Sequence, residues 1–247
     1  MAAFNQKPAD FSIYSASPWL IEGAPESVLP LFERAPVVEM PAHDENCFGV
    51  EDWVYLIDEG LVATYAIHPD MQNQMTGLFG HGCLLGAFKA LMHEKDFPPA
   101  LIMKALTPLR MRRLSARAFV NFLAADDHAA APAYLFLLRQ HEQQMEGMLL
   151  NDLLPVDMRL ARIIDTLFRA RGESLSERLK PVPVPVTVLQ LAEMVHADRA
   201  FLSRILSKWR EAECFERKGR RLLFSRAIFD ICLCLEGRER LVRAPHP

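Results

Sequence analysis

The chain has 247 residues, enough for one large domain or two ordinary ones, and its hydrophobic content of 51% is typical of a globular protein. The N-terminus lacks the basic-then-apolar pattern of a secretory signal, and no apolar run approaches the ~18 residues of a membrane helix. Five cysteines, an odd number scattered along the chain, argue against a disulfide scaffold, so we expect a cytoplasmic protein.

The net charge of −3 conceals an uneven distribution of charge along the chain. Residues 1–154 carry 10 lysines and arginines against 19 aspartates and glutamates, a net charge of −9. Residues 155–247 carry 18 against 12, a net charge of +6. Such a division is expected when only the C-terminal part approaches a polyanion such as a nucleic acid. Chance drift in surface charge is the alternative explanation.

The first part of the chain is predicted to be rich in β-structure. Residues 1–30 are a polar segment interrupted by prolines, with a short helix expected near 24–32. Short apolar runs follow, with Gly, Pro, Asp and Asn between them, at residues 37–40, 53–57, 61–65, 75–79, 100–106 and 109–114. Short strands at this spacing favour a β-barrel or jelly-roll-like unit. Residues 87–92 predict a helical turn inserted in it.

Helix-forming residues dominate from Ala116, over 116–125 and again over 133–154. In the second segment, side chains recur at steps of three and four residues, namely Leu138, His141, Met145 and Met148, with Tyr134, Leu135 and Leu149 beside them. A helix of ~20 residues is about 30 Å long, more than one core readily covers, so a second copy of the chain is expected on this stripe. The alternative is a helix folded back on its own β domain. Pro155 is expected to end or kink it, with a hinge over 151–157.

The basic C-terminal part begins with an amphipathic helix predicted over 158–171 and an extended segment over 182–186, where alternate prolines forbid helix. Thr187 and Gln190 have the spacing of a capping box, which opens a short helix. His196-Ala197-Asp198 is a turn in which Asp198 caps the next helix. That helix is expected to bury the side chains spaced i, i+3, i+4 and i+7, which are Leu202, Ile205, Leu206 and Trp209.

The opposite face of this helix is small, polar and cationic, which suits a DNA major groove. Residues 214–217 and 222–224 then predict two short strands around Lys218-Gly219-Arg220. Together these elements outline a winged helix-turn-helix. The candidate DNA contacts are Thr187, Arg199, Ala200, Ser203, Arg204, Ser207, Lys208, Lys218, Arg220 and Arg221. A plain helical hairpin with solvated arginines is the alternative.

This pattern resembles the CRP/FNR family of transcription regulators. That family usually shows a Thr, then L-A, a turn, and S-R-E-x-[VI]-[SG]-R-x-L. Here the matching residues are Thr187, Leu191-Ala192 and the run D-R-A-F-L-S-R-I-L over 198–206. Further matches over residues 15–230 are Arg159-Leu160-Ala161, the roll glycines Gly60, Gly82 and Gly86, and Phe119.

The resemblance implies an α+β fold with three parts. These are an effector-sensing N-terminal β-roll (jelly-roll-like) over 1–125, a long dimerisation helix over 126–154 and a winged helix-turn-helix over 155–247. It also implies a homodimer on double-stranded DNA with a two-fold symmetric operator, and it admits RNA polymerase as a further partner.

Two departures from the family pattern bear on specificity. Ala200 stands where the family usually has an acidic residue, and alanine cannot accept a hydrogen bond from cytosine N4, so we expect a half-site that differs at that base. The family's cyclic-nucleotide pocket usually pairs F-G-E with R-[ST]-A. The aligned residues here, Leu85-Gly86-Ala87 and Pro98-Pro99-Ala100, lack both the Glu and the Arg. A buried phosphate without a fixed cation is costly, so an unknown small effector other than cyclic AMP is expected there, or a roll without ligand.

Four soft side chains could in principle hold zinc or haem iron, namely His43, Cys47, His81 and Cys83. Their loose spacing is more typical of ordinary surface and core residues, so we expect no resident cofactor. The four-cysteine iron–sulfur pattern is absent from the sequence, because only Cys47 and Cys83 precede the long helix.

Catalytic motifs find little support. The sequence has no Gly-rich phosphate loop, nucleophile elbow or HExxH, and Asp126-Asp127-His128 is expected at a helix start. We therefore expect no enzyme. The main alternative to a transcription regulator is a cupin-like metal- or metabolite-binding protein, such as a haem or metal sensor, whose basic tail only tethers it. A third possible function is a helix-turn-helix that contacts other proteins instead of DNA.

Overall fold

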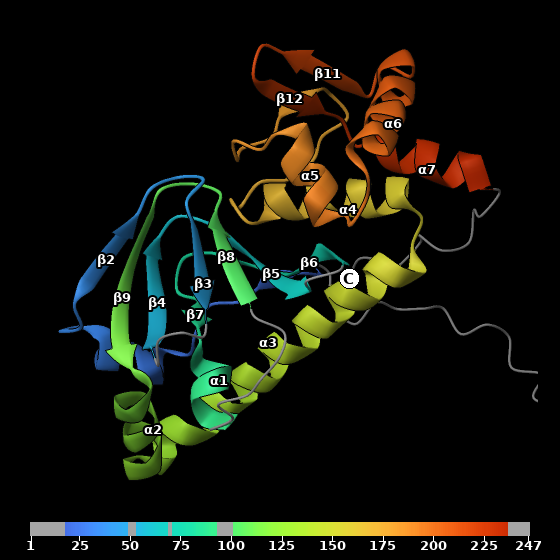
Figure 1. Ribbon diagram of the computed structural model, residues 1–247. Helices are drawn as coiled ribbons and strands as arrows, with labels where there is room; N and C mark the ends of the chain where they lie inside the picture. The colour runs from blue at the N-terminus through green and yellow to red at the C-terminus, as the bar shows by residue number, and fades with distance from the viewer. Residues whose placement is uncertain (1–17, 49–52, 69–70, 93–100, 237–247) are drawn as a thin grey trace, which may run out of the picture.

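The structure is a computed structural model of the chain, and it describes residues 18–48, 53–68, 71–92 and 101–236. Its N-terminal half is a roll of two sheets, with strand orders β1-β6-β5-β8-β3 and β2-β9-β4-β7 (Figure 1). The strands are β1 (Leu20–Ile21), β2 (Val37–Met40), β3 (Glu45–Phe48), β4 (Trp53–Glu59), β5 (Val62–His68), β6 (Met71–Phe79), β7 (Leu84–Leu85), β8 (Leu101–Ala105) and β9 (Leu109–Ser115). Ile57, Val62, Phe79, Met103 and Met111 belong to the buried apolar cluster of this roll.

Six of these strands coincide with the predicted apolar runs, whereas β1, β3 and β7 were not predicted. Strands β1 and β7 have two residues each, too few to show an alternating pattern. Strand β3 has the polar sequence E-N-C-F and owes its place to antiparallel pairing with β8. The η1 segment (Glu26–Phe32) is a 3-10 helix where a short helix was expected.

The three roll glycines are required by backbone geometry. Gly60, Gly82 and Gly86 have φ values of 102°, 77° and 79°, a region that residues with a Cβ rarely adopt. A Cβ on Gly86 would also lie 2.5 Å from the carbonyl oxygen of Trp53. These glycines therefore hold turns that other residues would strain.

The helices divide between the roll and the C-terminal part. Helices α1 (Ala87–Met92) and α2 (Ala116–Ala125) accompany the roll, and α3 (Asp127–Leu153), α4 (Val156–Arg169), α5 (Val188–Met194), α6 (Arg199–Glu211) and α7 (Ile228–Glu236) follow. Helix α3 begins at Asp127, as expected for a helix start at Asp126-Asp127-His128, and thus six residues before the run of helix formers that begins at Ala133. The carboxylate of Asp126 accepts hydrogen bonds from the backbone N–H groups of His128 and Ala129, and this cap starts the helix although Pro132 lies inside it.

Helix α3 has two apolar faces, one of which is buried and one exposed to solvent. One face, which includes Ala133, Leu137, Gly147 and Leu150, is buried in the monomer. The other remains exposed, and its members are Tyr134, Leu135, Leu138, Met145, Leu149 and Leu153. The helix therefore packs on its own roll through a face other than the predicted stripe, and most of that stripe, including Leu138 and Met145, stays uncovered.

Trp19 joins the chain's N-terminal segment to the middle of α3. Its side chain is completely buried, and a Cβ added to Gly147 would collide with its indole ring. The carbonyl oxygen of Trp19 accepts a 2.6 Å hydrogen bond from the N–H of Leu78 on β6. Gly147 thus allows the helix to approach the roll closely.

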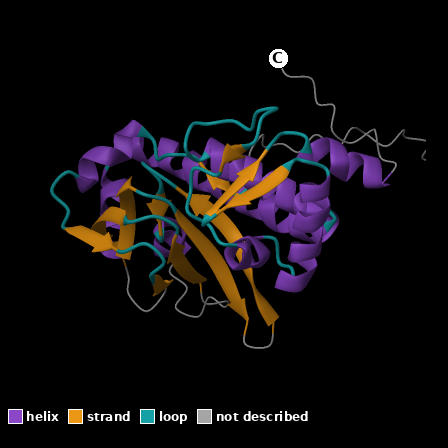
Figure 2. Ribbon diagram, turned by 90° about the horizontal axis from the view of Figure 1, so that it is seen from above, coloured by secondary structure: helices purple, strands orange, loops and turns teal. Residues whose placement is uncertain are grey.

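The C-terminal part packs α4–α7 around the small sheet β10-β12-β11, formed by β10 (Lys180–Pro181), β11 (Phe215–Lys218) and β12 (Arg221–Phe224) (Figure 2). Leu160 and Ala161 on α4 are fully buried, and the Arg159 guanidinium donates to the Val195 carbonyl at the end of α5 over 2.8 Å. The R-L-A triplet therefore ties α4 to the turn between α5 and α6. Within the described ranges, no helix combines the length and apolar character needed to span a membrane.

Candidate nucleic-acid interface

The α5–turn–α6 unit is built by two side-chain caps. Thr187 Oγ1 accepts from the Gln190 N–H at 3.2 Å, and Gln190 Oε1 accepts from the Thr187 N–H at 2.8 Å, so the predicted capping box is confirmed. Asp198 Oδ1 accepts from the N–H groups of Ala200 at 2.7 Å and Phe201 at 3.2 Å. These caps satisfy backbone donors that would otherwise lack a partner at each helix start, and they fix the direction of α6.

Helix α6 separates an anchoring face from an exposed face, as the sequence predicted. Its buried side chains are Leu202, Ile205, Leu206 and Trp209. The candidate contacts on this helix are all exposed, namely Arg199, Ala200, Ser203, Arg204, Ser207 and Lys208. The Ser203 hydroxyl donates to the Arg199 carbonyl at 2.9 Å, so its proton is already engaged within the helix.

The predicted wing is confirmed as the β11–β12 hairpin, which stands beside α6 in the same domain (Figure 1). Gly219 turns the hairpin with a φ of 60°, and the Arg217 Nε donates to its carbonyl at 3.1 Å. Lys218, Arg220 and Arg221 are exposed. Lys218 contacts Glu216 at 3.1 Å, but surface ion pairs of this kind contribute only ~0–1 kcal/mol, so phosphate can compete for the ammonium group.

The helix-turn-helix is docked on the roll through Lys104, whose role the sequence reasoning missed. Lys104 Nζ on β8 lies 2.9 Å from Glu45 and 3.1 Å from Glu193 on α5, and 5.3 Å from the centre of the Tyr65 ring. His43 Nδ1 and Gln190 Nε2 approach to 3.4 Å nearby. A lone lysine inside the apolar run 100–106 was the available sequence signal.

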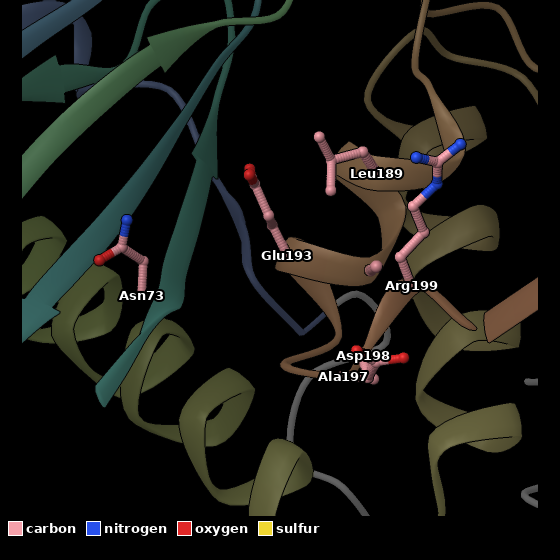
Figure 3. Close-up of a pocket in the computed structure, with 7 residues that line it drawn as sticks. Asn73, Leu189, Glu193, Ala197, Asp198 and Arg199 are labelled. Carbon is pink, nitrogen blue, oxygen red and sulfur yellow. The ribbon is translucent and has the colours of Figure 1, made fainter. Parts of the chain in front are cut away.

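A hollow of about 310 Å³ lies beside this contact, between the roll and the helix-turn-helix. Figure 3 shows Asn73 on its roll side, with Glu193 on α5 and Arg199 at the start of α6 on the other side. The first candidate base-reading arginine therefore stands next to the domain junction.

The two segments expected to line an effector pocket are only partly described. Leu85 and Ala87 are buried in different apolar clusters, and Gly86 forms the turn between them. Pro98, Pro99 and Ala100 lie outside the described residues. The pocket expected from the sequence stays a prediction.

The soft side chains considered for a metal have separate surroundings. His81 Nδ1 lies 2.6 Å from the Asp58 carbonyl oxygen, and His43 faces Gln190. Cys83 is buried and donates to the carbonyl oxygens of Ile21 and Glu22. Burial raises the pKa of the Cys83 thiol to about 12, which disfavours the thiolate that a metal needs. The Cys47 side chain lies outside the described part, and within that part no three His, Cys, Asp or Glu side chains gather at a metal-binding distance.

No protein-family model matches the sequence, and no curated protein does. Solved structures match over most of the chain. The c-di-GMP responsive global regulator CLP of Xanthomonas campestris is 16% identical with a TM-score of 0.67, and the match covers 81% of this chain and 98% of that one. A putative crp/fnr-family regulator from Eubacterium rectale is 11% identical with a TM-score of 0.66, over 84% of this chain and 94% of that one.

A third structure, a CRP-family transcriptional regulator from Thermus thermophilus, is 19% identical with a TM-score of 0.61, and the match covers 79% of this chain and 95% of that one. The chain has the fold of the CRP/FNR regulators. The predicted fold class, an N-terminal roll, a long helix and a C-terminal winged helix-turn-helix, is thereby confirmed. In this CRP/FNR fold, α6 occupies the second helix of the helix-turn-helix and β11–β12 the wing.

Proposed function

We propose that this protein is a DNA-binding transcription regulator that reads its operator with α6 and the β11–β12 wing. The observation that carries the proposal is the exposed face of α6, where Arg199, Arg204 and Lys208 accompany small side chains opposite the buried anchoring face. Arginine binds guanine edges bidentately, and small residues let the helix backbone enter the groove. The capped start of α6 fixes the helix backbone that carries these side chains before DNA arrives.

The individual roles follow from side-chain chemistry. Arg199 and Arg204 read base edges, while the Ala200 methyl contacts a thymine methyl where an acidic residue would bind cytosine. Lys218, Arg220 and Arg221 on the wing bind phosphates, as do Thr187, Ser203, Ser207 and Lys208 near the groove edges. Because the Ser203 proton is donated to the Arg199 carbonyl, its phosphate contact requires rotation of the hydroxyl.

The uncovered stripe of α3 supports a homodimer. Leu138 is 63% exposed and Leu149 is 51% exposed in the isolated chain, and a second α3 would remove both from water. Two copies then present two α6 helices to successive major grooves about 34 Å apart, which requires a two-fold symmetric operator. The parts are a sensing roll over 1–125, a dimerisation helix over 126–154 and the DNA-binding domain over 155–247.

The roll controls this contact through a small effector other than cyclic AMP. Ala87 and the segment 98–100 lack the Glu and Arg that would neutralise a cyclic phosphate. Structures of the same fold differ in effector, since CLP is described as c-di-GMP responsive and CprK was solved in complex with OCPA. A cytoplasmic location and contact with RNA polymerase complete the proposal.

Selection of bound duplexes from random DNA tests the function, followed by binding at several salt concentrations. Arg199→Ala is expected to relax the preference at one base position, whereas Lys218→Ala weakens binding to every sequence and lowers the salt slope by about one unit. Binding to no duplex even at low salt would overturn the proposal. Equal effects of both changes across a sequence panel would overturn the division of roles.

A further inference from the structure

An exposed aromatic ring lies on the proposed recognition helix, where the fold does not need it. Phe201 is 42% exposed, although α6 is already anchored by four buried side chains. On the helical wheel it lies at the edge of the outward face, on the side of Arg204. Part of this apolar ring remains in water, so a ligand that covered it would gain the free energy of burying that area.

Phe201 and Arg204 already form a pair in the absence of DNA. The guanidinium carbon of Arg204 lies 5.1 Å from the centre of the Phe201 ring, within cation–π range and at the i, i+3 spacing that brings helical side chains together. One face of the guanidinium is thereby supported by the ring, while its N–H edge stays free to donate to a base. The ring therefore restricts the rotamers of Arg204 before binding.

The position of the pair within the helix determines what it can meet. Phe201 is the third residue of α6, and the N-terminal residues of a recognition helix are those that contact base edges. In the major groove, the apolar group that a base offers is the C5-methyl of thymine. A guanidinium next to the ring offers two parallel donors to guanine O6 and N7.

We propose that Phe201 is a specificity-determining residue that packs on a thymine methyl while it positions Arg204 on a neighbouring guanine. The inference rests on the proposed function and deepens it by assigning a thymine–guanine neighbour pair to the half-site. The proposed contacts of Phe201 and Ala200 differ in reach, because the Phe201 ring extends to a thymine methyl that the single Cβ of Ala200 cannot cover.

Deoxyuridine substitution in the selected operator tests the contact, because it removes only the C5-methyl. Besides any thymine that Ala200 contacts, we expect one thymine per half-site, beside the guanine read by Arg204, at which the change weakens binding of the wild-type protein about fourfold, the effect of one buried methyl. In Phe201→Ala the same change is expected to have no effect, and the preference for the adjacent guanine falls. Leu189→Ala is the matched control, because Leu189 is 51% exposed on α5 and lies outside the recognition helix; it keeps both responses.

Two results would overturn the assignment. One is a wild-type protein that binds a specific operator yet shows no deoxyuridine-sensitive thymine beside the guanine read by Arg204. The other is Phe201→Ala with the sensitivity of the wild type, which would leave the ring to contact a protein instead. A wild-type protein that selects no DNA at all overturns the proposed function itself, so the two failures are distinguishable.

Discussion

Gly147→Ala is a sharp test of how the long helix sits on the roll. Gly147 lies within α3, where alanine is normally preferred over glycine by ~0.8–1.0 kcal/mol. Here the added Cβ would lie 2.5 Å from Nε1 and 2.7 Å from Cγ of Trp19, well inside van der Waals contact. The indole is fully buried and rigid, so it cannot swing away as the end of a flexible side chain would.

The expected magnitude is the difference between two opposing effects. Overpacking of this kind costs ~1–3 kcal/mol, and the helix preference returns ~0.8–1.0 kcal/mol of it. Gly147→Ala should therefore lower the free energy of unfolding by up to about 2 kcal/mol. In a Trp19→Ala background the ring is gone, and the same change should raise the free energy of unfolding by up to about 1 kcal/mol.

Urea unfolding of the four proteins, followed by circular dichroism, measures this reversal of sign as a double-mutant cycle. Glu142→Gly compared with Glu142→Ala, at an exposed site on α3, is the control for helix preference alone and should cost ~0.8–1.0 kcal/mol. If Gly147→Ala stabilised the otherwise unchanged protein, the close approach of Trp19 to α3 would be refuted.

Three further outcomes are expected. Leu138→Asp places a charge on the uncovered stripe of α3 and should shift the protein toward monomer in sedimentation at micromolar concentration. Asn121→Asp, at an exposed site on α2, should leave the oligomeric state unchanged, and an equal shift in both variants would argue against this interface. Asp198→Ala removes the α6 cap and should lower the free energy of unfolding, measured with urea, by ~0.5–2 kcal/mol. Asp198→Asn, which keeps a capping oxygen, should retain most of the stability, and an alanine variant as stable as the wild type would contradict the capping role. Burial raises the pKa of the Cys83 thiol to about 12, so as the pH rises the unfolded chain loses this proton before the folded chain does. The free energy of unfolding should therefore fall above the ordinary thiol pKa of ~8.5, by at most ~1.4 kcal/mol per pH unit. In Cys83→Ala the free energy of unfolding should fall less steeply with pH in urea unfolding, and a slope equal to that of the wild type would exclude a contribution from this thiol.

The winged helix-turn-helix was largely predictable because its signals are local. The capping box at Thr187 and Gln190 and the Asp198 cap depend on groups within three residues of each other. The exposed and buried faces of α6 follow from helical periodicity alone. Phe201 lay at the edge of that periodic pattern, so its pairing with Arg204 was not recognised from spacing.

The sequence by itself determined the capped helices, six strands of the roll, the two wing strands and the division of α6 into an anchoring and an exposed face, because each depends on neighbours a few residues apart. Only the tertiary structure decided the contacts between distant segments. Lys104 meets Glu193 across 89 positions, Trp19 meets Gly147, and β3 becomes a strand through its pairing with β8. These contacts carry no periodic signature, since they form only when the folded roll brings chemically complementary groups together and excludes water from between them.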